Sequence, residues 1–201
     1  RVDAVSGGLG IHLLNDRAGQ GTMITNRFSG MYAYQLAITR EFSMAFGLQA
    51  TFGQKRLDWK KLNFGDMIDP KYGFIYNTAE VRDKEVVSYP DFSFGVLGFS
   101  KRFYAGFAAF HLFEPDEAFL FTDSPLPMKY TGHVGAVVPL DGRYGESNLS
   151  PNIIYQQQGD LRELNLGLYV TKGAIVGGLW YRNADALTAL VGFQQDKIKM
   201  G

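Results

Sequence analysis

The feature that most constrains this chain is a period-two alternation of apolar residues with small or polar ones. Leu9, Ile11 and Leu13 alternate with glycine and histidine, and Leu166 and Leu168 alternate with asparagine, glycine and tyrosine. Successive side chains of a β-strand point to opposite faces, so this period indicates strands with two unlike faces. Helical spacing does not persist, and 24 glycines in 201 residues disfavour stable helices. The sequence therefore predicts an all-β protein.

Ten segments carry this pattern, and most exceed the five or six residues usual in soluble sheets. The expected strands are 5–14, 27–39, 42–57, 91–99, 103–112, 129–139, 150–157, 162–171, 174–182 and 186–195. A tilted strand that crosses a bilayer needs about 9–11 residues. The strand length therefore favours a transmembrane barrel, although the periodicity alone also permits a soluble all-β fold.

The connections between these segments alternate in length. Tight or modest connections are expected at 39–41, 100–102, 141–148 and 172–173. Those of the opposite parity are 15–26, 58–90, 113–128, 156–161 and 183–185, of which the first three are long. Tight turns at one end and long loops at the other are typical of outer-membrane barrels, whose long loops face outside the cell. We therefore expect the long connections outside and the tight turns in the periplasm.

The two faces of the expected strands differ in kind. One face is apolar, and the other carries glycine, serine, threonine, asparagine, glutamine and histidine, the reverse of a soluble barrel. An open sheet edge cannot sit in lipid, so such a sheet must close. The sequence predicts a single antiparallel outer-membrane β-barrel domain over 1–201, truncated at both ends, with 12–14 strands in the full protein. The apolar face that includes Leu164, Leu166, Leu168 and Val170 is expected to contact outer-membrane lipid.

No constellation of residues indicates catalysis. The 20 basic residues balance 20 acidic ones, which gives no support for binding nucleic acid. There is no cysteine, and His12, His111 and His133 lie on separate segments without the spacing of a metal site. No serine–histidine arrangement indicates an embedded hydrolase. We expect a protein that is no enzyme and holds no metal or other cofactor.

The two longest connections carry candidate binding residues. A 33-residue connection is far longer than strand pairing requires, and loops of that length are usually functional or disordered. This one, 58–90, is rich in the aromatic residues that are enriched at protein interfaces. The candidate partner-binding residues of 58–90 and 113–128 are Trp59, Phe64, Tyr72, Phe74, Tyr76, Phe113, Glu114, Phe119 and Phe121. We predict that these loops dock a protein; the alternative is that they fold inward and plug the lumen.

Several segments, taken in order, resemble one known family. They are 8–19, 46–50, 91–95, 103–107, 111–115, 126–131, 149–155, 158–160, 166–168 and 178–182. Each is weak alone, but the ordered set covers nearly the whole chain. It resembles the PorP/SprF family of type IX secretion outer-membrane proteins from Bacteroidetes.

The resemblance implies a non-enzymatic barrel that serves protein export and, in gliding species, the display of surface adhesins. The partners that it implies are the type IX translocon, the C-terminal signal domain of a secreted adhesin, and a periplasmic peptidoglycan-binding lipoprotein. The same barrel pattern also permits a channel or transporter of the porin or fatty-acid-transporter type, so both hypotheses stay open here.

Overall fold

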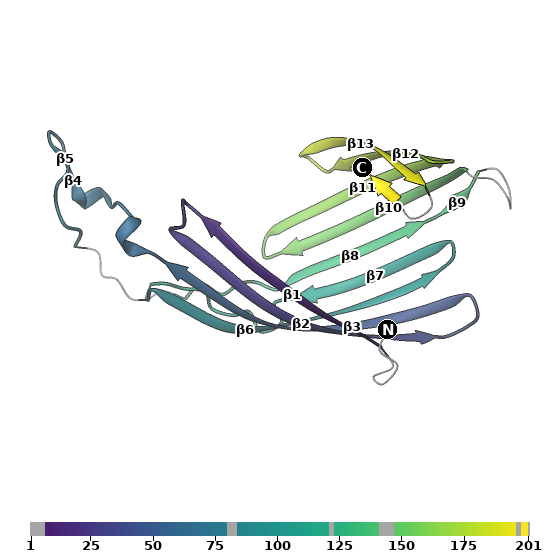
Figure 1. The fold of residues 1–201 in the computed structure, drawn as a ribbon, viewed down its shortest axis with the longest axis horizontal. Coiled ribbons are helices and arrows are strands. Elements are labelled where there is room, and N and C mark those ends of the chain that lie inside the picture. Colours follow the sequence, from purple (N-terminus) through teal and green to yellow (C-terminus); the bar gives the residue numbers. More distant parts are fainter. Residues whose placement is uncertain (1–6, 80–83, 121–122, 141–146, 196–197, 201) are drawn as a thin grey trace.

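The chain forms one twelve-stranded antiparallel sheet (Figure 1), seen in a computed structural model that describes residues 7–79, 84–120, 123–140, 147–195 and 198–200. Its strands are β1 (Gly7–Ala18), β2 (Met23–Ala37), β3 (Phe42–Leu57), β6 (Val86–Ser100), β7 (Phe103–Phe110), β8 (Lys129–Ala136), β9 (Val138–Pro139), β10 (Ser147–Gln158), β11 (Leu161–Lys172), β12 (Ile175–Arg182), β13 (Ala186–Gln195) and β14 (Ile198–Met200). They pair in sequence order, except that β9 pairs beside β8 on β10. Each of the ten expected strands is present, which confirms the all-β prediction.

The prediction of a long loop at 15–26 is wrong. β1 continues to Ala18 and β2 begins at Met23, so only 19–22 connect them. Gly19 and Gly21 adopt positive φ angles of 59° and 79° there, which glycine reaches without steric cost. The alternation ends before the pairing does, because Asn15 and Asn26 are polar yet still face each other across the ladder. Two of the five connections at this end are long, not three.

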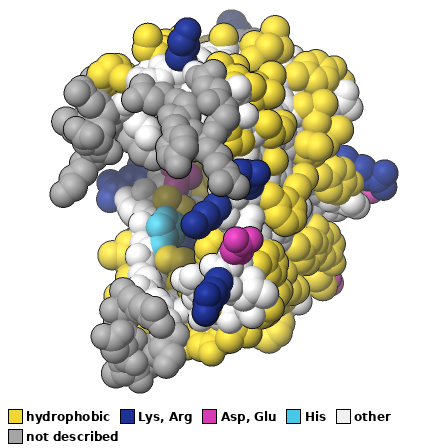
Figure 2. Space-filling view, turned by 90° about the vertical axis from the view of Figure 1, so that its right-hand side faces the viewer, with side chains coloured by type: hydrophobic (Ala, Val, Ile, Leu, Met, Phe, Trp, Pro, Cys, Tyr) yellow, Lys and Arg dark blue, Asp and Glu magenta, His cyan; other side chains and the backbone are white. Residues whose placement is uncertain are grey.

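The register sorts apolar side chains onto one face of the sheet. Leu13 pairs with Phe28, and Phe28 pairs with Phe52. The three side chains are 71%, 54% and 53% exposed, so this face has no protein cover. Figure 2, viewed from the end of the tight turns, shows hydrophobic side chains gathered on the outer side of the curved sheet. We call this the outward face, and Leu166 (41% exposed) belongs to it.

The opposite, inward face is polar. Ser29 and Thr51 are buried there and share a hydrogen bond of 2.8 Å, and Asp91 is buried beside them. Among the described residues, the buried hydrophobic side chains are limited to Trp59, Val87, Tyr89, Ala109 and Ala118. The sheet therefore lacks the dry apolar interior that a soluble barrel or sandwich would need.

The sheet is strongly curved, with β1–β3 on one side of Figure 1 and β12–β13 on the other. Among the described residues, no pairing joins β1 to β13 or β14, so the sheet is not closed. The antiparallel order and the two unlike faces are those expected of an outer-membrane barrel. Separately, no helix in the described ranges is long and apolar enough to cross a membrane.

Candidate functional site

The first long connection begins with a packed base. It contains η2 (Trp59–Lys61), η3 (Gly65–Met67), β4 (Ile68–Asp69) and β5 (Gly73–Phe74), and we call its residues 58–79 the arm. Trp59 is 5% exposed, and its indole N–H donates a hydrogen bond of 2.9 Å to the carbonyl oxygen of Lys84. Its ring lies 6.4 Å from that of Phe64 with an interplanar angle of 19°. Trp59 therefore fixes where the arm leaves the sheet.

The tip of the arm is a hairpin organised by one carboxylate. Asp69 Oδ1 accepts hydrogen bonds from the backbone N–H groups of Lys71 (2.8 Å) and Tyr72 (2.9 Å). The hydroxyl of Tyr76 donates to Asp69 Oδ2 over 2.9 Å. These bonds favour the ionised carboxylate, the backbone bonds most, and hold the pKa of Asp69 below its ordinary value.

A second carboxylate holds the segment that follows the hairpin. Asp66 Oδ2 accepts hydrogen bonds from the hydroxyl of Thr78 (3.0 Å) and the backbone N–H of Ala79 (2.7 Å). The carbonyl oxygen of Met67 accepts from the backbone N–H groups of Ile75 (3.1 Å) and Tyr76 (3.2 Å). Local hydrogen bonds therefore give the far part of the arm its shape, whereas its base also contacts the β1–β2 turn, where the backbone N–H of Asp58 donates to the carbonyl oxygen of Thr22 over 2.8 Å.

Four large side chains at the tip remain exposed. The exposed fractions of Tyr72, Phe74, Ile75 and Tyr76 are 67%, 58%, 56% and 52%. The arm stands away from the sheet, with β4 and β5 at its far end (Figure 1). Apolar residues gathered on an ordered, projecting hairpin are a feature of protein interaction sites.

The second long connection, 111–128, folds back onto the inward face at Glu117. The Glu117 carboxylate accepts hydrogen bonds from the ammonium group of Lys55 and the hydroxyl of Tyr89, and an Arg27 Nη lies 3.9 Å away. Burial raises the pKa of Glu117, but these hydrogen bonds and positive charges outweigh it, so the pKa is lower than usual. A charged group with several partners thus fastens this connection to the sheet.

Further contacts fix the rest of 111–128. His111 Nδ1 lies 2.7 Å from Asp91 Oδ2 on the inward face. Asp116 Oδ1 accepts from the backbone N–H groups of Ala118 (3.1 Å) and Ser124 (2.8 Å). The backbone N–H of Lys84 donates to the carbonyl oxygen of Phe119 over 3.2 Å, which links the two long connections.

The structure separates the nine candidate binding residues into groups. Tyr72, Phe74 and Tyr76 come together at the tip, whereas Trp59 and Phe64 form the base.

The other four belong to 111–128. Phe113 is 66% exposed with its ring centroid 4.9 Å from that of Phe92, Glu114 Oε1 accepts from the Met128 backbone N–H over 3.2 Å, and Phe119 is half-buried. Phe121 lies outside the described residues. The alternative from the sequence was that the long loops fold inward. Glu117 and its neighbours do fold onto the inward face, but the arm does not.

The sequence analysis missed the group formed by Glu117, Lys55 and Tyr89. One signal was available, since Arg27 and Lys55 place two cations on a face that otherwise carries small polar groups. No spacing rule connects them with an acid more than fifty residues later. In the described ranges, no three histidine or acidic side chains gather as a metal site would require.

One comparison with known proteins gives a match. The model of a family described as "Type IX secretion system membrane protein PorP/SprF" matches residues 1–201, the whole chain. No curated protein and no solved structure matches the chain.

Proposed function

Since the chain belongs to the PorP/SprF family of type IX secretion system membrane proteins, we propose that it docks an exported protein at the outer membrane. It does so as a non-enzymatic component of the secretion and gliding machinery. The observation that carries this proposal is the exposed aromatic tip of the arm. Tyrosine and phenylalanine supply large contact areas at low cost in conformational entropy.

The partner at the tip is the C-terminal signal domain of a secreted adhesin or a subunit of the type IX translocon. The arm lies at the end with the long connections, which in this class of barrel faces outside the cell. The tight turns then face the periplasm, where a peptidoglycan-binding lipoprotein can reach them. A tag inserted at Asn77 should be labelled on intact cells, and one at Lys172-Gly173 should not; the reverse would overturn this orientation.

The outward face of the sheet, on this proposal, contacts outer-membrane lipid. Leu166 and Asn165 are adjacent on β11 but belong to opposite faces, so they form a matched pair. Arginine at Leu166 should cost about 2–4 kcal/mol if the position lies near the bilayer midplane, whereas arginine at Asn165 should be tolerated. The measurement is the free energy of unfolding from bilayers. Equal tolerance at both positions would overturn the membrane assignment.

The docking proposal is tested by replacing Tyr72, Phe74 and Tyr76 together with serine. Truncation of central interface aromatics typically costs about 2 kcal/mol or more each, so partner capture should be lost. The barrel should stay heat-stable and membrane-inserted, because the three side chains make few contacts with the sheet. Leu161→Ser is the control, since Leu161 is 79% exposed and lies on β11, away from both long connections. Capture that survives the triple substitution would contradict docking at the arm.

A channel of the porin or fatty-acid-transporter type is the second candidate. The polar inward face favours it, because a water-filled lumen requires such a lining. Ion conductance of the protein in planar bilayers separates the two candidates. If the protein with serine at positions 72, 74 and 76 still captures its partner and only gains ion conductance, the arm is a plug and the channel hypothesis is supported.

A further inference from the structure

The inward face changes character along three successive rows that cross β1, β2, β3 and β6. The first row is His12, Ser29, Thr51 and Asp91. The second row is Gly10, Met31, Gln49 and Ser93. The third row is Gly8, Ala33, Gly47 and Gly95, and its largest side chain is a single methyl group. Over these three rows the inward face therefore changes from polar side chains to nearly bare backbone.

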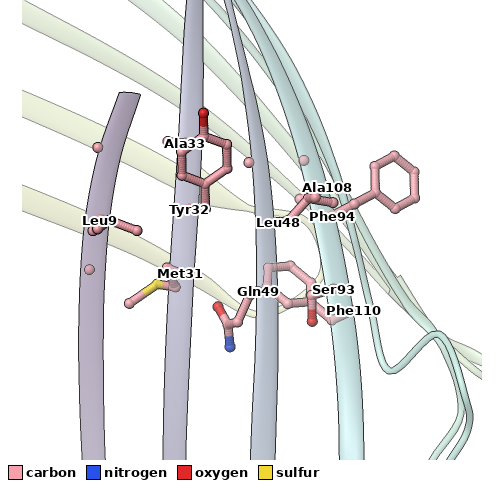
Figure 3. Close-up of a pocket in the computed structure, with 14 residues that line it drawn as sticks. Leu9, Met31, Tyr32, Ala33, Leu48, Gln49, Ser93, Phe94, Ala108 and Phe110 are labelled. Atoms are coloured by element: carbon pink, nitrogen blue, oxygen red, sulfur yellow. The ribbon is translucent and has the colours of Figure 1, made fainter. Parts of the chain in front are cut away.

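A furrow of about 450 Å³ lies over the bare row and extends to Ala108 and Phe110 of β7 (Figure 3). A Cβ atom at Gly8 would meet no other atom within 4 Å, and one at Gly47 would be 4.0 Å from its nearest neighbour. At Gly8 and Gly47 the missing side chains thus leave space that no described residue fills, whereas a Cβ atom at Gly95 would lie 3.4 Å from the carbonyl oxygen of Phe107. Its volume lies in the range of about 300–1,000 Å³ that is typical of ligand sites.

A polar cavity of about 230 Å³ adjoins this furrow and shares Gln49, Ser93 and Phe110 with it. Arg27 and Lys129 line the polar cavity. Of the acids nearby, Asp91 contacts His111, and Glu117 contacts Lys55, Tyr89 and Arg27, whose Nη lies 3.9 Å from it. Lys129 forms no ion pair with any described residue. The cavity therefore has positive charge in excess, which suits an anion.

Ser93 stands where the two cavities meet. It is 6% exposed, and its hydroxyl makes no hydrogen bond to another residue in the part of the chain that the structure describes. Met31, Gln49 and Ser93 lie on successive strands along the furrow, while the ring of Phe94 points away (Figure 3). In the part of the chain that the structure describes, no buried side-chain nitrogen or oxygen lacks a hydrogen-bond partner, so the Ser93 hydroxyl is open to the cavity. A ligand oxygen there can take the place of water as its partner.

We propose that this site binds one long-chain carboxylate, with the alkyl tail in the furrow and the carboxylate beside Ser93, Arg27 and Lys129. An alkyl chain fits better than a peptide. The backbone N–H and C=O groups along the bare row already pair within the sheet, so a peptide in the furrow would bury polar groups without partners. A saturated chain has none to satisfy. The inference is independent of docking at the arm.

The test uses the full-length protein in phosphatidylcholine nanodiscs with palmitate that carries a diazirine on its terminal carbon. Labelling should saturate, and the adduct should map to inward-facing Met31, Ala33 or Ala108. Adducts found only on outward-facing Leu48 and Phe94, without saturation, would show surrounding lipid contact and overturn the proposal.

Two glycine variants test the furrow. Gly47→Leu fills it and should lower saturable labelling at least tenfold. Gly30→Leu is the matched control, because Gly30 faces outward on β2 and a Cβ atom there would also meet no other atom within 4 Å. Gly8→Leu fills the other end of the furrow, so it replaces Gly47→Leu should that protein fail to insert. Undiminished labelling in an inserted furrow variant would overturn the site.

The head-group assignment is tested with hexadecanol that carries the same diazirine. Arg27→Gln with Lys129→Gln should lower palmitate labelling at least tenfold and leave hexadecanol labelling unchanged. Equal labelling of the normal protein by the acid and the alcohol would contradict carboxylate recognition. The triple-serine variant of the arm tip should label like the normal protein, so failure of docking and failure of this site are distinguishable.

Discussion

The two long connections are alike in their aromatic content but are placed differently in the structure. Both are rich in phenylalanine and other large residues, and both predict a protein interface equally well. The arm projects from the sheet with Tyr72 and Phe74 exposed, whereas 111–128 lies against the inward face at Glu117. The difference teaches that the placement of charged groups, more than aromatic content, decides where such a connection goes.

Each connection places its carboxylates differently. In the arm, Asp66 and Asp69 accept hydrogen bonds from residues within fourteen positions, so the segment is ordered by itself. In 111–128, Glu117 reaches Lys55 and Tyr89 on two strands of the sheet. Local bonds make a free-standing hairpin, and long-range charge pairing makes a docked segment. Separate substitutions in the two connections should therefore have separate effects.

The largest expected effect on stability is at the base of the arm. Trp59→Ala removes a buried indole ring, and large-to-small changes of this kind cost about 3 kcal/mol or more. Hydrogen exchange of backbone amides in η2 and η3 should accelerate more than 100-fold, while amides of β11 stay protected. Trp59→Phe keeps most of the ring and should lose about 1 kcal/mol through the hydrogen bond to Lys84. Unchanged exchange in Trp59→Ala would mean that the base does not hold the arm.

A smaller effect is expected where 111–128 docks. Glu117→Gln removes the charge that Lys55 and Tyr89 contact, at a cost of about 2 kcal/mol. Chymotrypsin should then cleave within 111–128 more than tenfold faster and leave the arm unaffected. Glu114→Gln is the matched control, because among the described residues the Glu114 carboxylate accepts a single hydrogen bond, from the backbone N–H of Met128. Equal cleavage rates in the two variants would show that Glu117 does not hold 111–128 against the sheet.

The docked segment should also respond to acid, whereas the arm, which the ionised Asp69 organises, should respond only below the ordinary pKa of that carboxyl, 3.8. The pKa of Glu117 is lower than its ordinary 4.5, so its contribution is fully present above pH 4.5 and is lost only as pH falls below that value. The chain has no cysteine, so a spin label on Leu120→Cys is unique. Its spectrum should stay broad at pH 5–7 and sharpen below pH 4.5. A spin label that is as mobile at pH 7 as it is below pH 4.5 would contradict docking through Glu117.

The smallest effect is expected at the tip. Tyr72→Ser should change the free energy of unfolding by less than about 0.5 kcal/mol, because the side chain is 67% exposed. Thermal unfolding in bilayers measures this. A loss above 1 kcal/mol would show that the tip packs against something within the protein.

The fold could be predicted because the alternation of apolar and polar residues survives wherever a strand has one apolar and one polar face. The prediction of the strand ends failed at Asn15 and Asn26, where both faces are polar although the strands still pair. The aromatic content of the tip was visible in the composition, but its exposure was not, because the equally aromatic 111–128 lies against the sheet. The contact of Glu117 with Lys55 and Tyr89 could not, because it depends on how a curved sheet brings distant residues together. The furrow also depends on register, which places Gly8, Gly47 and Gly95 in one row.

The most direct test of docking at the arm is a photo-crosslinking amino acid placed at Tyr76 in living cells. The account predicts an adduct with a secreted adhesin domain or a translocon subunit, identified by mass spectrometry. The same residue at Phe193, on the outward face of β13, should give no such adduct. Crosslinks from Tyr76 that lead only to inward-facing residues of this same chain would show that the arm closes over its own sheet and would contradict the account.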